Sequence, residues 1–308
     1  MKNKIISVIG GSGFIGQYLV NYLLTKGFYV KILSRHAEII KPKYTLSKLG
    51  QLALINCDIK QFKQIKNAIK GSEIVINLTG LLSETKNNSF EQVHNIGTKN
   101  IVNACQGLGV TKLLHLSAIG ASKSSNSIYA RTKFLGENNI SQFKNYIIIR
   151  PSIVYGDEDN FINYFAKLSK FSPFIPLIGG GKTKFQPIWV QDLVNVIGIL
   201  LEKNGPKLVE VGGDEIISFK SIIIKINNEL EQKRYLLNIP FGLSKKVAYL
   251  LEKIPNPILT KDQVELLKSD NVINRKYSYK KIIKYIPKPF DMMLEKQLIK
   301  YKKRGGHY

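Results

Sequence analysis

IISVIGGSGFIGQYLV, residues 5–20, is the stretch that decides the fold, because here an apolar run ends in a turn crowded with glycines. Gly11, Gly13 and Gly16 satisfy the spacing GxGxxG, and the set that begins at Gly10 satisfies GxxGxxG. In either register the glycines let the chain turn sharply and approach a pyrophosphate, and the last one lets the following helix pack on the strand. Because it follows an apolar strand and opens an amphipathic helix, the turn is predicted to bind a dinucleotide.

The N-terminus of the helix that follows this turn is also expected to contact the dinucleotide. Free N–H groups and the positive end of the helix dipole face the phosphates. The residues expected to contact a cofactor in this way are Gly10, Gly11, Ser12, Gly13, Phe14, Ile15 and Gly16.

Strand-like apolar runs alternate with helical patterns as far as residue 156. The strands are continuously apolar, which indicates parallel strands covered on both faces. This pattern predicts an α/β Rossmann fold, a doubly wound parallel sheet. Beyond that point the alternation decays, and prolines break a mostly helical remainder. We therefore expect an NAD(P)-binding Rossmann core over 1–156, with late core elements within 183–213, and a smaller, mostly helical C-terminal lobe over 157–308.

The formal net charge of +24 over 308 residues suggests an anionic partner. Lysine is abundant along the whole chain, however, which indicates a compositional bias, and no nucleic-acid-binding motif accompanies it. We therefore expect no nucleic-acid partner. The local concentration near the C-terminus is either a solvated terminus or a docking site for an anionic membrane surface or an acidic partner. Its residues are Lys280, Lys281, Lys284, Lys288, Lys300, Lys302, Lys303 and Arg304.

Cysteine use and hydropathy bear on the compartment. Cys57 and Cys105 stand alone in apolar stretches without metal-ligand spacing, which predicts buried free thiols in a reducing compartment and no metal site. No apolar run reaches the ~18 residues of a membrane span. MKNK is too short for a signal peptide or presequence. We therefore expect a cytoplasmic protein, with at most peripheral contact at the inner face of the cytoplasmic membrane.

The end of the second expected strand, LSRH, bears on which dinucleotide is bound. A carboxylate there would bind the adenosine ribose of NAD, but this chain has Ser34 and Arg35. A hydroxyl and a guanidinium can bind a 2′-phosphate that a carboxylate would repel. The sequence therefore favours NADP(H), with NAD(H) as the alternative in which Arg35 only points into solvent.

Two later strand ends add further candidates. Asp58 follows the third expected strand, where it either accepts from the adenine amino group, with Ile59 packing on the ring, or caps the next helix. Asn77, Thr79 and Gly80 follow the fourth strand, beside the expected cofactor groove, where we expect main-chain contact with the nicotinamide half.

Tyr129 and Lys133 stand at YxxxK spacing on an expected helix, which places both on one face. A neighbouring ammonium favours the phenolate form of tyrosine, which suits proton transfer at a carbinol or carbonyl oxygen. The lysine is also suited to hold the nicotinamide ribose. Ser117, at the end of the preceding strand, is the candidate third hydroxyl, although several serines follow it closely.

VIGGSGFIG, INLTG, YARTK and IRPSIVYGDED together resemble the extended short-chain dehydrogenase/reductase superfamily, in its NAD-dependent epimerase/dehydratase branch. The resemblance covers nearly the whole chain, and it implies main-chain contact of Pro151 to Ile153 with the nicotinamide amide. Two departures reduce the case for sugar epimerisation. Ala118 stands where enzymes of the branch usually carry a second hydroxyl, and no acid follows the second strand.

HLSAIGA, LIGGGKTKFQPIWVQDL and EVGGDEIISF look like the atypical members grouped with the nucleotide-binding accessory subunit of respiratory complex I (NADH:ubiquinone oxidoreductase). This resemblance implies tight NADPH binding, a peripheral position against the membrane arm and no assigned turnover. Two functions therefore stay open. One is an accessory or assembly component of complex I. The other is an active NADP-dependent oxidoreductase or epimerase that uses Tyr129 and Lys133 on a carbonyl or alcohol such as a quinone precursor or nucleotide sugar.

Overall fold

The computed structural model describes residues 4–37, 48–203, 206–254, 257 and 259–302, which form two compact units. The first unit comprises residues 1–150, 193–210 and 277–284. The second comprises residues 151–192, 211–276 and 285–308.

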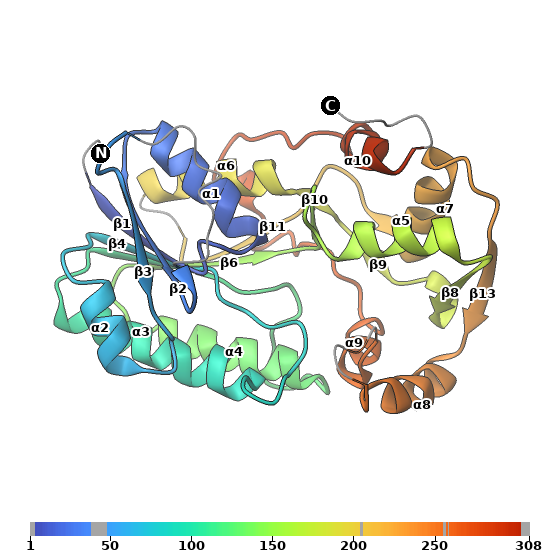
Figure 1. Ribbon diagram of the computed structural model, residues 1–308, viewed down its shortest axis with the longest axis horizontal. Coiled ribbons are helices and arrows are strands. Elements are labelled where there is room, and N and C mark those ends of the chain that lie inside the picture. The colour runs from blue at the N-terminus through green and yellow to red at the C-terminus, as the bar shows by residue number, and fades with distance from the viewer. Residues whose placement is uncertain (1–3, 38–47, 204–205, 255–256, 258, 303–308) are drawn as a thin grey trace. The chain divides into compact units, whose positions relative to one another are not determined.

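A seven-stranded sheet in the order β11-β6-β5-β4-β1-β2-β3 forms the centre of the first unit (Figure 1). The pairs around β1, β2, β4 and β5 are all parallel. β6 and β11 also run in parallel, since the amide of Ile148 donates to Lys207 and that of Ser152 to Val211. The expected doubly wound sheet is thereby confirmed. The strands are β1 (Ile5–Ile9), β2 (Tyr29–Ser34), β3 (Leu52–Asn56), β4 (Ile74–Asn77), β5 (Lys112–Leu116), β6 (Tyr146–Pro151) and β11 (Leu208–Val211).

Helices cover both faces of this sheet. Figure 1 shows α1 and α6 on one face and α2, α3 and α4 on the other. The helices are α1 (Phe14–Thr25), α2 (Phe62–Ala68), α3 (Gly97–Gly107), α4 (Ile128–Ile140) and α6 (Val190–Glu202), together with a π-helical turn (Glu91–Ile96) and a 3₁₀ turn (Tyr279–Lys281).

Burial follows the place of each strand in the sheet. Every residue of the central strands β4 and β5 is buried, whereas β3 at the edge has none that is fully buried. A parallel sheet between two helix layers excludes water from its middle strands, which explains their continuously apolar sequence. α1 buries Leu19, Val20, Leu23 and Leu24, which form one stripe at helical spacing.

The second unit combines short paired strands with helices. β7 pairs with β10, β9 with β12 and β8 with β13. Its elements are β7 (Val154–Tyr155), α5 (Phe161–Phe171), β8 (Phe174–Ile178), β9 (Lys184–Phe185), β10 (Ile188–Trp189), β12 (Ile217–Ser218), α7 (Phe219–Glu229), β13 (Tyr235–Ile239), α8 (Phe241–Leu251), α9 (Lys261–Leu266) and α10 (Phe290–Leu298), with 3₁₀ turns at Gly179–Gly181 and Ile299–Tyr301.

The units differ from the domains expected over 1–156 and 157–308. The first stretch of the first unit ends at residue 150, its second stretch, 193–210, lies within the expected 183–213, and residues 277–284 also return to it. These residues pair with the outer side of the edge strand β11, where the amide of Glu210 donates to the carbonyl of Tyr277 over 2.7 Å. A single paired residue carries no strand-like pattern, so the sequence gives no sign of this return.

The cysteines and the helices agree with the expected buried thiols and the lack of a membrane-spanning apolar run among the described residues. Cys57 and Cys105 are both buried, and desolvation raises the pKa of each thiol to about 12. Among the described residues, no helix has the length and apolar character needed to cross a bilayer.

Candidate functional site

The candidate site lies at the carboxyl ends of β1 and β4, which are neighbours in the middle of the sheet. From β1 the chain proceeds outward through β2 and β3, and from β4 it proceeds outward through β5 and β6 in the opposite direction. Such a reversal opens a crevice outside the strand ends, where doubly wound proteins bind ligands.

The glycine turn has the close backbone packing that its sequence predicts. Gly10 has φ of +79°, which residues with a side chain rarely adopt. A Cβ on Gly16 would lie 2.7 Å from the Cα of Gly11, so helix α1 rests directly on the turn. A Cβ on Gly11 would lie 3.1 Å from the carbonyl oxygen of Val8. The glycines therefore allow strand, turn and helix to touch through their backbones.

The first turn of α1 is suited to an anion. Gly13 is the N-cap residue and is exposed, so it offers no side chain to bond the first N–H groups, and the turn contains no acidic residue. Phe14 and Ile15 are half-buried beside it. The side-chain amide of Gln17 donates to the Ser12 carbonyl over 3.0 Å and fixes the turn. The positive end of the helix dipole is thus not compensated by a carboxylate within the helix.

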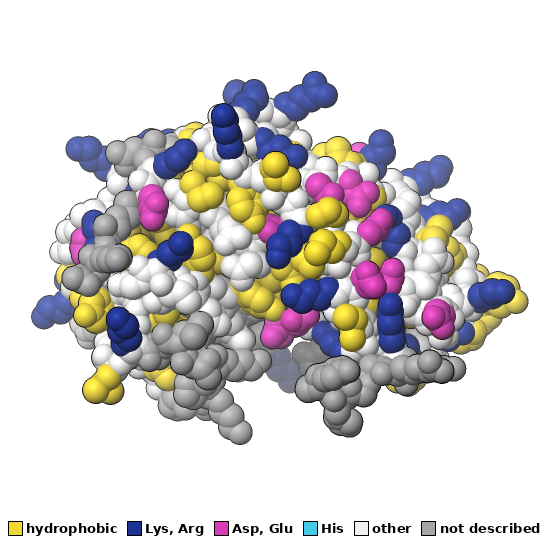
Figure 2. Space-filling view, turned by 90° about the horizontal axis from the view of Figure 1, so that it is seen from above, with side chains coloured by type: hydrophobic (Ala, Val, Ile, Leu, Met, Phe, Trp, Pro, Cys, Tyr) yellow, Lys and Arg dark blue, Asp and Glu magenta, His cyan; other side chains and the backbone are white. Residues whose placement is uncertain are grey.

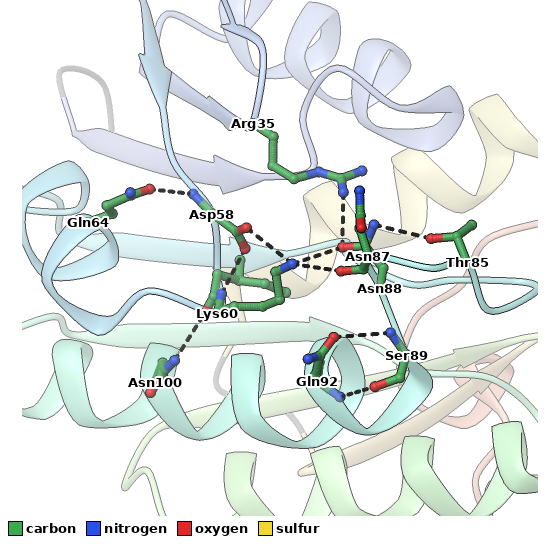
Figure 3. A network of polar contacts seen from close by, with 11 residues as sticks. Arg35, Asp58, Lys60, Gln64, Thr85, Asn87, Asn88, Ser89, Gln92 and Asn100 are labelled. Atoms are coloured by element: carbon green, nitrogen blue, oxygen red, sulfur yellow. Dashed lines mark hydrogen bonds and ion pairs between the residues drawn. The ribbon is translucent and has the colours of Figure 1, made fainter.

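Ser34 and Arg35 lie where β2 ends, one strand away from the turn. The Ser12 hydroxyl donates to the Ser34 hydroxyl over 3.1 Å, which links the glycine turn to this strand end. The guanidinium of Arg35 is exposed but bonded, since Nη1 donates to Oδ1 of Asn88 over 3.0 Å (Figure 3). Arg35 is therefore bonded to the loop at Asn88, and its contact with a 2′-phosphate stays a prediction.

Asp58 and Ile59 follow β3. Helix α2 has Gln61 as its N-cap residue, so the alternative in which Asp58 caps this helix is wrong. The Asp58 carboxylate instead accepts from the backbone N–H of Lys60 over 2.9 Å and pairs with its ammonium (Figure 3). Ile59 is buried against α3, where a Cβ on Gly97 would lie 2.6 Å from its Cδ1. Its packing against an adenine ring stays a prediction.

Asn77, Thr79 and Gly80 follow β4. The Asn77 side chain is fully buried, and its Oδ1 accepts from the N–H and the hydroxyl of Thr79. These bonds fix the conformation of the chain just after β4. Gly80 is exposed, and a Cβ there would lie 3.8 Å from Nζ of Lys133. Gly80 thus brings the backbone beside the lysine of the YxxxK pair.

Lys133 is buried in α4, and its ammonium donates to the carbonyl of Leu116 over 2.8 Å. Desolvation lowers the pKa of Lys133 to about 8, while the Glu137 carboxylate acts in the opposite direction. Ser117, the next residue after Leu116, is buried, and its hydroxyl has no partner among the described residues. Lys133 therefore sits beside the candidate serine at the end of β5.

Tyr129 lies one helical turn before Lys133 and is half-buried. Its ring stands edge-on to Phe90 at 5.7 Å and to His94 at 5.4 Å, measured between ring centroids. Aromatic contacts therefore set the orientation of the phenol.

Comparison with known proteins identifies the family. Residues 7–133 match the 3-beta hydroxysteroid dehydrogenase/isomerase family. The chain is 34% identical over 274 residues to NADH dehydrogenase (ubiquinone) 1 alpha subcomplex subunit 9 of Dictyostelium discoideum, covering 86% of this chain and 76% of that protein. It belongs to this subunit family. The Arabidopsis thaliana member is 29% identical over 320 residues, which covers 99% of this chain and 79% of that protein.

A solved structure shows that the fold is shared more widely. UDP-glucose 4-epimerase of Thermus thermophilus, in complex with NAD, superposes with a TM-score of 0.73 at 18% identity, over 97% of this chain and 99% of that one. The relatives thus confirm the resemblance to the complex I subunit, and the epimerase shares the fold expected from the resemblance to the extended short-chain dehydrogenase/reductase superfamily.

Two histidines that the sequence did not single out lie beside the YxxxK pair of this family member. Nε2 of His94 accepts from the N–H of Leu81 over 3.0 Å, so the proton is on Nδ1, which donates to the Thr132 hydroxyl over 3.0 Å. Burial and the Lys133 charge lower the pKa of His94 to about 3, so the ring is neutral at physiological pH. The π-helical turn Glu91–Ile96 places this ring against Tyr129.

His115 is the second. Because Oδ1 of Asn77 already accepts from Thr79, the amide nitrogen of Asn77 donates to Nδ1 of His115 over 3.0 Å. The proton of His115 is therefore on Nε2, which is buried without a partner among the described residues. Desolvation, followed by the Lys133 charge, lowers its pKa well below the usual value. From the sequence alone, a single histidine in an apolar strand does not reveal these contacts or this lowered pKa.

Pro151 and Ile153 are the remaining expected contacts. Pro151 is buried as the last residue of β6, and the carbonyl of Ile153 accepts from the N–H of Ile188 over 2.9 Å. Both belong to the second unit, and their contact with a nicotinamide amide stays a prediction.

Proposed function

We propose that this protein binds NADP(H) at the turn after β1 and serves as an accessory or assembly component of a respiratory complex I at the membrane surface. Family membership carries the proposal, since relatives that match most of their own length are named as subunits of NADH dehydrogenase (ubiquinone). NADP(H) is favoured over NAD(H) because a hydroxyl and a guanidinium, Ser34 and Arg35, stand where a carboxylate would select NAD.

The geometry of the first unit supports a dinucleotide. The reversal of chain direction at β1 and β4, the backbone contact at Gly16 and the uncompensated first turn of α1 are the features that suit a pyrophosphate. The superposed epimerase carries NAD in the same fold.

A second function rests on the intact YxxxK pair. A nicotinamide cofactor supplies a hydride acceptor or donor when bound. In oxidation of an alcohol, the Tyr129 phenolate would take the hydroxyl proton as the hydride leaves the carbinol carbon, while the Ser117 hydroxyl donates to the substrate oxygen. The buried ammonium of Lys133 and the unpartnered hydroxyl of Ser117 favour this alternative.

Membrane attachment through the basic C-terminal segment is the part of the proposal that concerns Lys300 and Lys302, and both are bonded within the chain. Lys300 donates to the carbonyl of Asp157, and Lys302 pairs with Glu229 at 3.1 Å. Lys303 and Arg304 lie outside the described residues. On the face seen in Figure 2, Lys and Arg side chains are spread among acidic and apolar ones, as expected for a chain-wide bias. If the tail docks at the inner face of the cytoplasmic membrane, deletion of residues 300–308 should abolish binding to anionic vesicles. Unchanged sedimentation with such vesicles would remove this part of the proposal.

Native mass spectrometry of the protein purified from detergent-solubilised membranes tests the main proposal. We expect a retained dinucleotide and co-purifying subunits of a respiratory complex. Protein that carries neither would overturn it. Assays with NADPH and a panel of quinones and carbonyls separate the alternative, because steady turnover that Tyr129→Phe abolishes and Tyr146→Phe spares would establish an enzyme.

A further inference from the structure

Lys60 lies at the end of β3 and holds a loop against it. Its ammonium donates to the carbonyl of Asn87 over 2.9 Å and to Oδ1 of Asn88 over 3.2 Å. Its third acceptor is the Asp58 carboxylate, at 3.5 Å. Figure 3 shows these contacts converging on Lys60 from the strand end and from the loop.

Two cations share a single neutral acceptor in this cluster. Oδ1 of Asn88 accepts both from Lys60 and from the guanidinium of Arg35, whose Nη1 is 3.0 Å away (Figure 3). An amide oxygen carries only a partial charge, whereas cations form their strongest hydrogen bonds with carboxylates and phosphates. A phosphomonoester would therefore compete effectively with Asn88 for the same two donors.

The cluster lies next to the glycine turn. Arg35 follows β2 and Lys60 follows β3, which are adjacent parallel strands, so both side chains start from the carboxyl edge of the sheet. The bond between the hydroxyls of Ser12 and Ser34 connects this edge to the turn after β1. A dinucleotide whose pyrophosphate lies on α1 directs its adenosine ribose to the end of β2.

We propose that Lys60 acts with Arg35 as a specificity-determining residue for an adenosine 2′-phosphate, and that this phosphate displaces the Asn88 amide and releases residues 85–88 from the strand ends. The inference rests on dinucleotide binding at the proposed site. Asp58 keeps a role in it, because its carboxylate accepts from the backbone N–H and the ammonium of Lys60 and positions both. NAD, which lacks the phosphate, leaves the amide in place.

Release of this loop bears on the reactive end of the site. The Glu84 carboxylate accepts from the N–H of Phe90 over 2.8 Å, and the Phe90 ring packs against Tyr129. At its other end the loop is held by the bond from the Leu81 N–H to His94. The loop therefore connects the two cations to the surroundings of the phenol, and occupancy of the phosphate position is expected to alter hydrogen exchange there.

Calorimetric titration with NADP⁺ and with NAD⁺ tests the specificity. We expect Lys60→Gln to weaken NADP⁺ about tenfold, as loss of one charge-assisted hydrogen bond implies, and NAD⁺ less than twofold. Lys66→Gln, at an exposed lysine in α2 outside this loop, is the matched control and should leave both unchanged. An equal loss for both nucleotides in Lys60→Gln would overturn the assignment.

Asn88 variants keep the test decisive if Lys60→Gln folds poorly. Asn88→Asp places a full negative charge between the cations and should weaken NADP⁺ at least tenfold relative to NAD⁺, whereas Asn88→Ala removes the competitor and should strengthen NADP⁺. Amide exchange in residues 85–88 should rise with NADP⁺ and not with NAD⁺. Asn88→Asp that leaves the ratio unchanged contradicts the inference. Wild-type protein that binds neither nucleotide instead contradicts the proposed function.

Discussion

The two ends of the candidate site are built differently. The end near β2 and β3 has exposed or half-buried polar groups, of which Arg35 and Lys60 bond to Asn88 in an outer loop. The end near β4 and β5 contains the buried side chains of Lys133 and His94, which bond to the backbone carbonyl of Leu116 and the backbone N–H of Leu81. The first arrangement can exchange partners when an anion arrives, while the second is fixed before any ligand binds. The two ends of the candidate site thus differ in how far solvent reaches their polar groups.

The buried end should depend most on the rigidity of α4. Arg150 donates to both oxygens of Glu137 in α4, over 2.8 and 2.6 Å, and lies 3.6 Å from Glu210. Arg150→Met removes the cation that these two buried carboxylates share, and it should lower the free energy of unfolding by about 3–5 kcal/mol. Urea denaturation measures this. Arg150→Lys, which keeps the charge, should lose less, and a loss below about 1 kcal/mol for the Met variant would show that α4 does not rely on the pair.

The pH dependence of stability should reveal the burial of Lys133. Its pKa is about 8 in the folded protein and near 10.5 when unfolded, so the unfolded chain binds more protons between these values. Lys133 therefore destabilises the fold below pH 8, and this effect fades as pH rises toward 10.5, by about 1.4 kcal/mol per unit. Lys133→Met should be more stable than wild type at pH 7, with a difference that shrinks by pH 10. A pH-independent difference in urea denaturation would refute the burial.

Gly16→Ala tests the backbone contact that both ends share. The added Cβ meets the backbone of Gly11, so α1 must move away from the turn. We expect a loss of about 1–3 kcal/mol in stability and a weaker affinity for both dinucleotides. Gly107→Ala, in a helix position where a Cβ meets nothing within 4 Å, is the control and should be neutral or stabilising. Unchanged nucleotide affinity in Gly16→Ala would show that nucleotide binding does not depend on this backbone contact.

Arg35→Ala should have the smallest effect and the most selective one. Loss of the guanidinium should weaken NADP⁺ by about 1.5 kcal/mol, roughly tenfold, and leave NAD⁺ nearly unchanged. The NADP⁺ affinity of Arg35→Lys should lie between those of wild type and Arg35→Ala, because lysine keeps the charge but lacks the forked donors of the guanidinium. Equal losses for both nucleotides, measured by calorimetry, would mean that the exposed end does not select the phosphate.

Local spacing made much of this site predictable. The glycines from Gly10 to Gly16 and the pair Tyr129 and Lys133 are close in sequence, and their spacing alone places them on one turn or one helix face. The roles of Asp58 and Arg35 were open, because a strand end does not reveal which loop covers it. The acceptor for Arg35 is Asn88, which lies 53 residues further along the sequence.

By itself, the sequence determined the doubly wound fold, the dinucleotide-type turn and the family, because apolar periodicity and glycine spacing are local properties of the chain. Only the tertiary structure decided that residues 277–284 rejoin the first unit, that the Lys133 charge acts on His94 and His115, and that Lys60 and Arg35 share one amide oxygen. These features depend on which buried polar groups find partners across the fold, and such pairing is set by packing of distant segments.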